Sequence, residues 1–277
     1  MAPVKSKYYI GDVHGRADLL EVMLSGIEAH AAERKLNPEI IFLGDLTDRG
    51  PESLGVLELV IHAIDKWKGS RLVLGNHDEW FRETLLLEDD YQYAESWLLN
   101  GGIQTIMSYC NGTVPNDAMK TIRAKYPHHL ELLKNASRIL INGAFIGVHA
   151  GIDPTRSLRM QRSFDVNWIR EPFLNFVEPK MAPVIHGHTY WGPQPIVTEN
   201  RISIDTGAYN FGVLTTCFVD AENKTIKLYQ ADRENFFEVQ PRLLDRGYGT
   251  VYDRLDEIFN EPDKVLAPMM QEFGIYG

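Results

Sequence analysis

Five short apolar segments of this chain each run into a glycine-containing turn that carries aspartate, asparagine or histidine. The segments have strand length and are rich in Ile, Val, Leu and Phe, a composition that favours β-structure. The polar groups that follow them are residues 11–15 (GDVHG), 44–50 (GDLTDRG), 75–78 (GNHD), 149–151 (HAG) and 186–189 (HGHT). Open α/β sheets place their sites at one edge, beyond the strand ends. The pattern therefore predicts one polar site assembled from distant parts of the chain.

The same apolar segments predict an α/β fold. Strand-like segments occupy residues 7–10, 39–43, 71–74, 144–148, 182–185, 201–204 and 212–219. Helical periodicity in residues 17–33 and 51–66, between the first three strands, indicates βαβ units. Residues 79–134 keep a helical spacing of apolar side chains, so we expect a helical insertion there. From residue 202 onward, turn signals such as residues 220–224 predict a second, largely antiparallel sheet.

The chain has 277 residues, of which 44% are hydrophobic. That is enough for a large core, and we expect one catalytic domain over residues 1–277. Residues 230–277 form an acidic, proline-interrupted C-terminal extension with possible helices at 250–259 and 263–273 and no role that the sequence assigns. The sequence does not determine the oligomeric state.

Charge and cysteine content limit the partners and the compartment. The formal net charge is −10, so the surface repels polyanions and long nucleic acid is a poor partner. Two cysteines, Cys110 and Cys217, are too few for a disulfide framework, and the first residues do not resemble a secretory signal. We expect a cytoplasmic protein. No apolar run approaches the roughly 18 residues of a membrane span, so we expect no membrane association.

The first two motifs place acidic residues directly after predicted strands. Asp12 and His14 are two residues apart and face the same way in an extended chain, so both can reach one cation. Alone they could equally satisfy loop amides. In the second motif, Asp48 and Pro51 fit the start of a helix, but this does not explain why Asp45 repeats the position of Asp12.

Three further motifs add an amide and histidines. Asn76 supplies an oxygen ligand for a hard or borderline cation, and His77 can donate a proton. His149 and His188 each end a strand close to a glycine, which distinguishes them from isolated histidines. We interpret His186 as a supporting residue, and four others as structural: His30, His62, His128 and His129.

Six candidate ligands exceed what one ion needs. They are Asp12, His14, Asp45, Asn76, His149 and His188. Two ions about 3.5–4 Å apart, bridged by one carboxylate, account for them and suit in-line displacement at phosphorus. Oxygen and imidazole ligands without thiolate indicate Mn, with Fe, Zn and Co as alternatives.

The five motifs, in this order, resemble the calcineurin-like metallophosphoesterase superfamily and, more narrowly, its Ser/Thr protein phosphatase branch. Residues 97–102 and 168–171 are similar to features of bacterial and phage members. The resemblance implies a layered α/β/β/α sandwich of the metallo-dependent phosphatase type.

The resemblance also implies a role for each residue. Asp12, His14 and Asp45 would hold the first metal. Asp45 would bridge to a second metal, which Asn76, His149 and His188 complete. The remaining assignments are catalytic: His77 protonates the leaving oxygen, Asp48 orients His77, and Arg49 and Arg170 clamp the phosphate.

Two positions depart from the wider superfamily. Tyr190 stands where many members carry a further metal-binding histidine, and nuclease-like members usually keep that histidine. This difference favours the protein phosphatase branch. Asp78 stands where many protein phosphatases have Glu, with no obvious mechanistic consequence.

The sequence therefore predicts a phosphomonoesterase, most simply a Ser/Thr protein phosphatase with phosphotyrosine as an open alternative. A metal-bridging hydroxide would attack the phosphorus, and the substrate would be a phosphoprotein or a small phosphoester. One alternative is a symmetrical dinucleoside tetraphosphate hydrolase, whose corresponding motif tends to lack the residue equivalent to Asp48. The other is a catalytically silent scaffold, which would not need the complete set of ligands and the proton donor.

Overall fold

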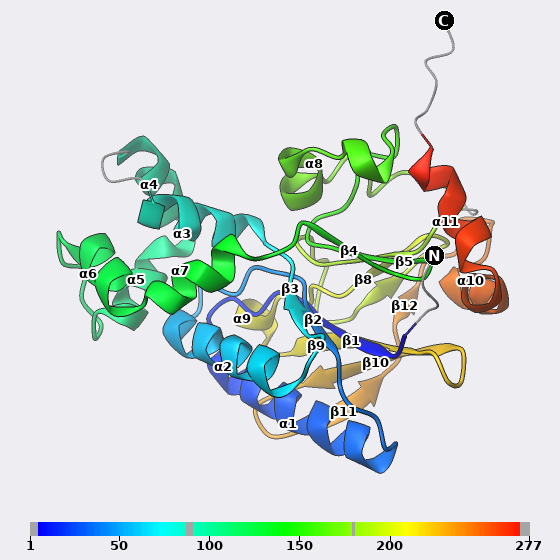
Figure 1. Ribbon diagram of the computed structural model, residues 1–277, viewed down its shortest axis with the longest axis horizontal. Helices are drawn as coiled ribbons and strands as arrows, with labels where there is room; N and C mark the ends of the chain where they lie inside the picture. The colour runs from blue at the N-terminus through cyan, green and yellow to red at the C-terminus, as the bar shows by residue number, and fades with distance from the viewer. Residues whose placement is uncertain (1–4, 87–90, 179–180, 272–277) are drawn as a thin grey trace, which may run out of the picture.

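Two six-stranded sheets pack face to face, with helices on their outer sides (Figure 1). The computed structural model describes residues 5–86, 91–178 and 181–271. The first sheet contains β1 (Lys7–Ile10), β2 (Ile40–Phe42), β3 (Arg71–Leu72), β9 (Leu214–Asp220), β10 (Thr225–Ala231) and β11 (Phe236–Val239). Its strand order is β11-β10-β9-β1-β2-β3, and β1, β2 and β3 run parallel.

The second sheet completes the sandwich. It contains β4 (Ile139–Asn142), β5 (Phe145–Val148), β6 (Val184–His186), β7 (Ile196–Val197), β8 (Arg201–Ser203) and β12 (Arg242–Leu243). Its strand order is β12-β7-β8-β6-β5-β4, with β5, β6 and β8 parallel at its centre. The predicted layered α/β/β/α sandwich is thus confirmed.

Alternation along β1 shows how the layers form. Tyr8 and Ile10 join the core under α1 (Ala17–Glu33) and α2 (Ser53–Lys66), whereas Tyr9 joins the core between the sheets. Successive strand residues point to opposite faces, so a strand buried on both faces is apolar throughout. Figure 1 shows α1 and α2 covering the outer face of the first sheet.

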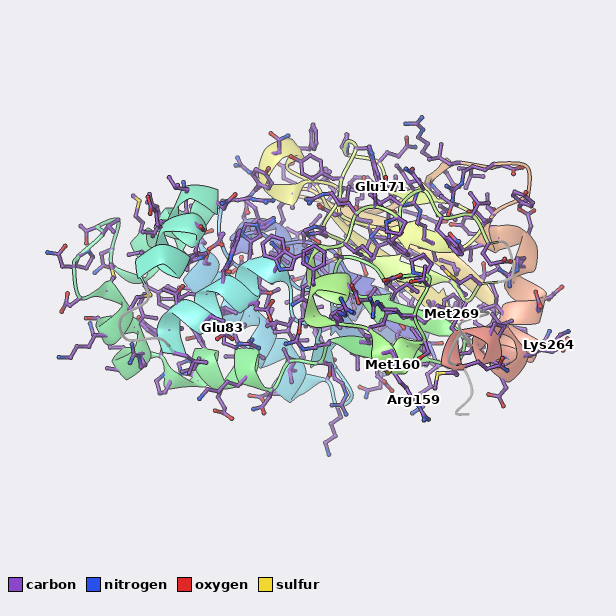
Figure 2. All side chains as sticks on the ribbon, turned by 90° about the horizontal axis from the view of Figure 1, so that it is seen from above. Glu83, Arg159, Met160, Glu171, Lys264 and Met269 are labelled. Atoms are coloured by element: carbon purple, nitrogen blue, oxygen red, sulfur yellow. The ribbon has the colours of Figure 1, made fainter. Side chains whose placement is uncertain are left out.

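Between β3 and β4 the described elements are all helical. They are α3 (Asn76–Leu86), α4 (Tyr91–Trp97), a π-helical turn (Leu98–Gly102), α5 (Ile103–Tyr109), α6 (Ala118–Lys125) and α7 (Pro127–Lys134). This helical segment forms one end of the molecule, marked by Glu83 in Figure 2, with Lys264 at the opposite end.

The remaining helices lie later in the chain. They are a 3-10 turn (Leu158–Met160), α8 (Ser163–Trp168), α9 (Ala208–Phe211), a 3-10 turn (Val251–Arg254), α10 (Leu255–Asn260) and α11 (Pro262–Met270). Buried Ile258, Val265 and Leu266 join α10 and α11 to the core of the second sheet. The C-terminal extension is therefore an integral layer, and its last six residues lie outside the described part of the chain.

The prediction of a separate antiparallel sheet after residue 202 was wrong. β9 pairs antiparallel with β1, and β10 and β11 continue that sheet. β8, in contrast, runs parallel to β6 in the second sheet. The reason is a long-range contact. β2 pairs with one edge of β1, and the buried backbone groups at the other edge of β1 also need hydrogen-bond partners, which β9 supplies.

Candidate active site

The predicted ligands meet at one edge of the sandwich because the strands that precede them are parallel. Asp12 and His14 follow β1, Asp45 follows β2, and Asn76 opens α3 just after β3. On the second sheet, His149 follows β5 and His188 follows β6. All are buried except His188, which is partly buried.

Asp45 lies at the centre of this group. Its Oδ2 is 3.5 Å from Nε2 of His14, and its Oδ1 is 3.3 Å from Nε2 of His149. Two sets of potential metal ligands each gather their ligand atoms within 4.8 Å: one joins Asp45 to His14 and His77, the other to His149 and His188. The two sets share Asp45, which is the position a bridging carboxylate would occupy.

Asn76 and Asp12 complete the cluster in different ways. Oδ1 of Asn76 lies 2.9 Å from both Nε2 of His149 and Nδ1 of His188. Nε2 of His188 is buried and has no hydrogen-bond partner among the described residues. Asp12 belongs to neither three-residue set; its two carboxylate oxygens accept the backbone N–H of His188, each at 3.1 Å. Asp12 therefore also orients the histidine turn of the second sheet.

The charges fit divalent cations. Burial and the nearby carboxylate of Asp205 raise the pKa of Asp12 well above its ordinary value. Burial likewise raises the pKa of Asp205 to about 6. Buried carboxylates close together are unfavourable without a positive charge between them. Together with the imidazole nitrogens of His149 and His188 that face Asn76, these oxygen and nitrogen donors suit borderline divalent metals.

His77 and Asp48 form a buried pair beside the cluster. Nδ1 of His77 lies 2.7 Å from Oδ2 of Asp48. The indole N–H of Trp97 donates to both oxygens of Asp48, at 3.0 and 2.9 Å, and the hydroxyl of Thr105 donates to Oδ1 at 2.6 Å. Burial raises the pKa of Asp48, although these donors favour its ionised form. The helical segment thus fixes the carboxylate that orients His77.

Arg49 reaches into the site, whereas Arg170 lies at its rim. The guanidinium of Arg49 lies 2.8 Å from Nε2 of His14 and 2.9 Å from Nε2 of His77, above the ring of Tyr209. A cation held by His14 therefore requires Arg49 to turn away. Arg170 is exposed. Burial, followed by the charge of His149, lowers the pKa of His188 to about 2, and the charge of Arg170 adds a smaller effect in the same direction.

The turns that carry the site have unusual backbone geometry. Among the described residues, eight non-glycine residues have positive φ, and five of them are predicted site residues. These five are His14, Asp45, Asp48, Arg49 and His188. Such left-handed conformations cost free energy and gather at functional sites. Hydrogen bonding holds the second turn: Asp78 accepts the N–H groups of Leu46 at 2.9 Å and Thr47 at 3.3 Å.

Three residues that shape the site were not identified from the sequence. Asp205 follows β8 and precedes a glycine, so it carried the same strand-end signal as the residues that were identified. The sequence indicates no mechanistic consequence for Asp78, yet its carboxylate accepts backbone N–H groups of the turn before Asp48. Tyr209 offered no local signal; only the tertiary structure places its ring 4.9 Å from the guanidinium of Arg49.

Comparison with known proteins gives one family for this arrangement. The calcineurin-like phosphoesterase profile matches residues 8–211. A bis(5'-nucleosyl)-tetraphosphatase PrpE [asymmetrical] from Bacillus velezensis is 28% identical over 245 residues, covering 79% of this chain and 90% of that protein. Serine/threonine-protein phosphatase 1 from Salmonella typhimurium is 26% identical over 219 residues, covering 75% and 89%.

The fold has a solved counterpart. A cold-active protein tyrosine phosphatase structure aligns with a TM-score of 0.51 at 17% identity, covering 86% of this chain and 79% of that one. This similarity supports the fold alone. Among the described residues, no helix is both long and apolar enough to cross a membrane.

Proposed function

Starting from the fact that this chain belongs to the calcineurin-like phosphoesterase family and is a hydrolase, we propose that it dephosphorylates serine and threonine residues of proteins. The observation that carries this proposal is the 2.7 Å contact between His77 and Asp48. A serine or threonine alkoxide is a poor leaving group and needs a proton as the P–O bond breaks. A nucleotide phosphate leaves more readily, so it depends less on such a donor.

His77 is the proton donor in this proposal, acting through Nε2. Nδ1–H bonded to Asp48 keeps the ring oriented, so that Nε2 faces the cluster, where Arg49 now contacts it at 2.9 Å. Asp48 stabilises the protonated imidazole before the proton is transferred. Trp97 and Thr105 keep Asp48 from rotating, which makes them positioning residues.

We assign the six ligands to two divalent ions. Asp12, His14 and Asp45 would hold one ion. The second would be held by Asp45, Asn76, His149 and His188. When bound, such ions supply Lewis acidity and lower the pKa of water. Manganese is our first expectation, with Fe, Zn and Co as alternatives.

Arg49 and Arg170 bind the phosphate oxygens in this proposal. A planar guanidinium matches two phosphate oxygens at once. Arg49 exchanges its contacts with His14 and His77 for the incoming phosphate, which couples metal loading to substrate binding. Arg170 approaches from the exposed rim, close to His188.

Hydrolysis of dinucleoside tetraphosphates is the second candidate, because relatives covering most of this chain carry that name. Both reactions use the same metal cluster and the same arginines. They differ in the leaving group, which is an alkoxide in one and a nucleotide phosphate in the other.

The test compares a phosphoserine and a phosphothreonine peptide with diadenosine tetraphosphate, each with Mn²⁺ and at equal concentration. We expect kcat/KM to be at least tenfold higher for the peptides. The nucleotide products need separation by chromatography, since symmetrical cleavage gives two ADP and asymmetrical cleavage gives ATP and AMP. A preference for diadenosine tetraphosphate would favour the second candidate.

A further inference from the structure

A second group of potential metal ligands lies between α2 and α7, separate from the cluster around Asp45. It joins Glu58 of α2 to His128 and His129 in the first turn of α7. Oε1 of Glu58 lies 3.1 Å from Nε2 of His128 and 3.1 Å from Nε2 of His129. Both histidines were interpreted as structural from the sequence, because nothing local links them to Glu58.

The spacing of the three atoms suits a tetrahedral cation. Zinc binds imidazole nitrogen and carboxylate oxygen at about 2.0–2.2 Å, so neighbouring ligand atoms in a tetrahedron lie roughly 3.3 Å apart. The two separations of 3.1 Å fall close to that value. Glu58 and His128 are each 46% exposed, which leaves room for a solvent ligand at the fourth position.

His129 is held as metal-binding histidines usually are. It is fully buried, Tyr126 stacks on its ring, and its Nδ1 lies 2.6 Å from the hydroxyl of Tyr109. A hydrogen bond to Nδ1 fixes the orientation of the imidazole ring and directs Nε2 toward the metal. A hydroxyl can donate or accept, so Tyr109 can serve the ring in either tautomer.

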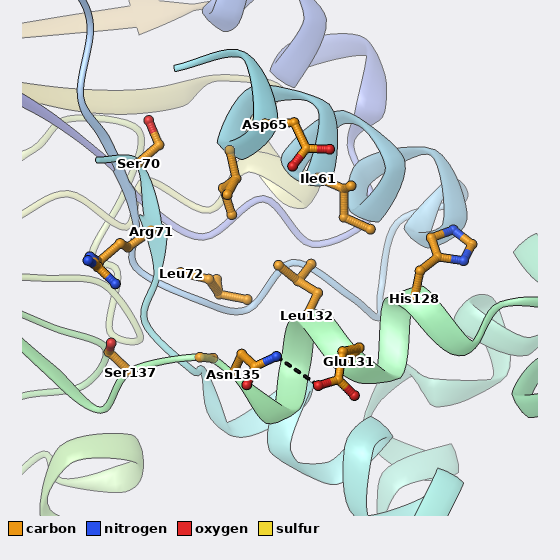
Figure 3. Close-up of a pocket in the computed structure, with 12 residues that line it drawn as sticks. Ile61, Asp65, Ser70, Arg71, Leu72, His128, Glu131, Leu132, Asn135 and Ser137 are labelled. Carbon is orange, nitrogen blue, oxygen red and sulfur yellow. Dashed lines mark hydrogen bonds between the residues drawn. The ribbon is translucent and has the colours of Figure 1, made fainter. Parts of the chain in front are cut away.

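The cluster lies beside open space between the two helices. His128 also lines a cavity of about 440 Å³ between α2 and α7, whose other charged lining residues are Asp65, Arg71 and Glu131 (Figure 3). Ile61 and Asp65 follow Glu58 at helical spacing, on the face of α2 that looks toward α7.

We propose that Glu58, His128 and His129 bind one zinc ion, which ties the helical segment to α2. The site stands apart from the proposed catalysis. Its consequence is structural: α7 belongs to the segment that also supplies Trp97 and Thr105 to Asp48, so zinc strengthens the packing behind the active site.

Zinc content of the full-length protein tests the site directly. Wild type and variants are stripped of metal, incubated with micromolar Zn²⁺, desalted and analysed by plasma emission. We expect His128→Ala and Glu58→Gln each to retain one zinc ion fewer per chain than wild type. His62 is an exposed histidine on α2, the helix that carries Glu58. His62→Ala should retain the wild-type number of zinc ions. Equal zinc content in all four proteins would overturn the proposal.

Thermal denaturation gives a second readout, because a ligand that binds only the folded state raises Tm. In an Asp45→Asn background, which weakens the metal cluster of the active site, Zn²⁺ should still raise Tm. Adding His128→Ala should remove that rise, while adding His62→Ala should not. A Zn²⁺-dependent rise in Tm of the same size with and without His128→Ala would also refute the site.

Discussion

The Nδ1 atom of His77 lies 2.7 Å from Oδ2 of Asp48, and the same carboxylate accepts the indole N–H of Trp97. His77 is the second residue of α3, Asp48 follows β2, and Trp97 ends α4. The helical segment therefore helps to hold the proposed proton donor in place.

Asp48→Asn should reveal the leaving-group dependence of the reaction. We expect kcat for a phosphoserine peptide to fall by about 10²–10³-fold, because Asn does not stabilise a protonated His77. Hydrolysis of 4-nitrophenyl phosphate should fall far less, since nitrophenolate departs without a proton. Steady-state kinetics on both substrates, with exposed Asp65→Asn as control, give the comparison. Equal losses on the two substrates would argue against His77 as the acid.

Removal of divalent metal should abolish hydrolysis, and Asp45→Asn should have nearly the same effect. Asp45 is the only residue common to both ligand sets, so its loss weakens both ions at once. We expect activity to fall by at least about 10³-fold in both cases. Adding Mn²⁺ should restore the activity of the chelated wild type. Full turnover by Asp45→Asn in Mn²⁺ would contradict the two-ion assignment.

Gly187→Ala should disable the cluster without touching a ligand. A Cβ at this position would stand 1.9 Å from Oδ1 of Asp12, so the carboxylate must move away from His188. We expect Mn²⁺ affinity, measured by calorimetry, to fall by about 10–100-fold, as for other supporting contacts of metal sites. Gly55→Ala is the matched control, since its nearest contact is an ordinary 3.4 Å. Unchanged affinity in Gly187→Ala would show that Asp12 has no part in binding.

Asp220→Asn should lower stability in a pH-dependent way. Burial raises the pKa of Asp220, but hydrogen bonds from Asn223 and Arg34 outweigh this effect and hold the pKa below its ordinary value. A depressed folded-state pKa stabilises the fold above the unfolded value of about 3.9, and this contribution disappears as pH falls through the folded value.

The free energy of unfolding should therefore fall by about 1 kcal/mol at pH 7 in Asp220→Asn, and by less at pH 3. Urea denaturation at the two pH values measures the difference. Glu222→Gln is the control, because this exposed partner lies 3.9 Å from the same Arg34. An effect of the same size at both pH values would mean that the charge of Asp220 contributes nothing.

Local sequence predicted what local physics controls. The spans of β1 and α1 follow from apolar periodicity, and the structure has both at the predicted residues. Parallel strands end at one edge, so the meeting of Asp12, Asp45 and His149 also followed from order along the chain. Asp205 carried the same signal and was overlooked.

Other features depend on contacts between distant residues. The attachment of β9 to β1 joins residues about 210 positions apart, and no local periodicity encodes which free strand edge is filled. The same holds for Trp97 against Asp48, for Tyr209 under Arg49, and for Glu58 beside His128. The sequence by itself thus determined which residue types end the strands. Only the tertiary structure decided their partners, because side chains far apart in the chain become neighbours only when the sheets and helices pack.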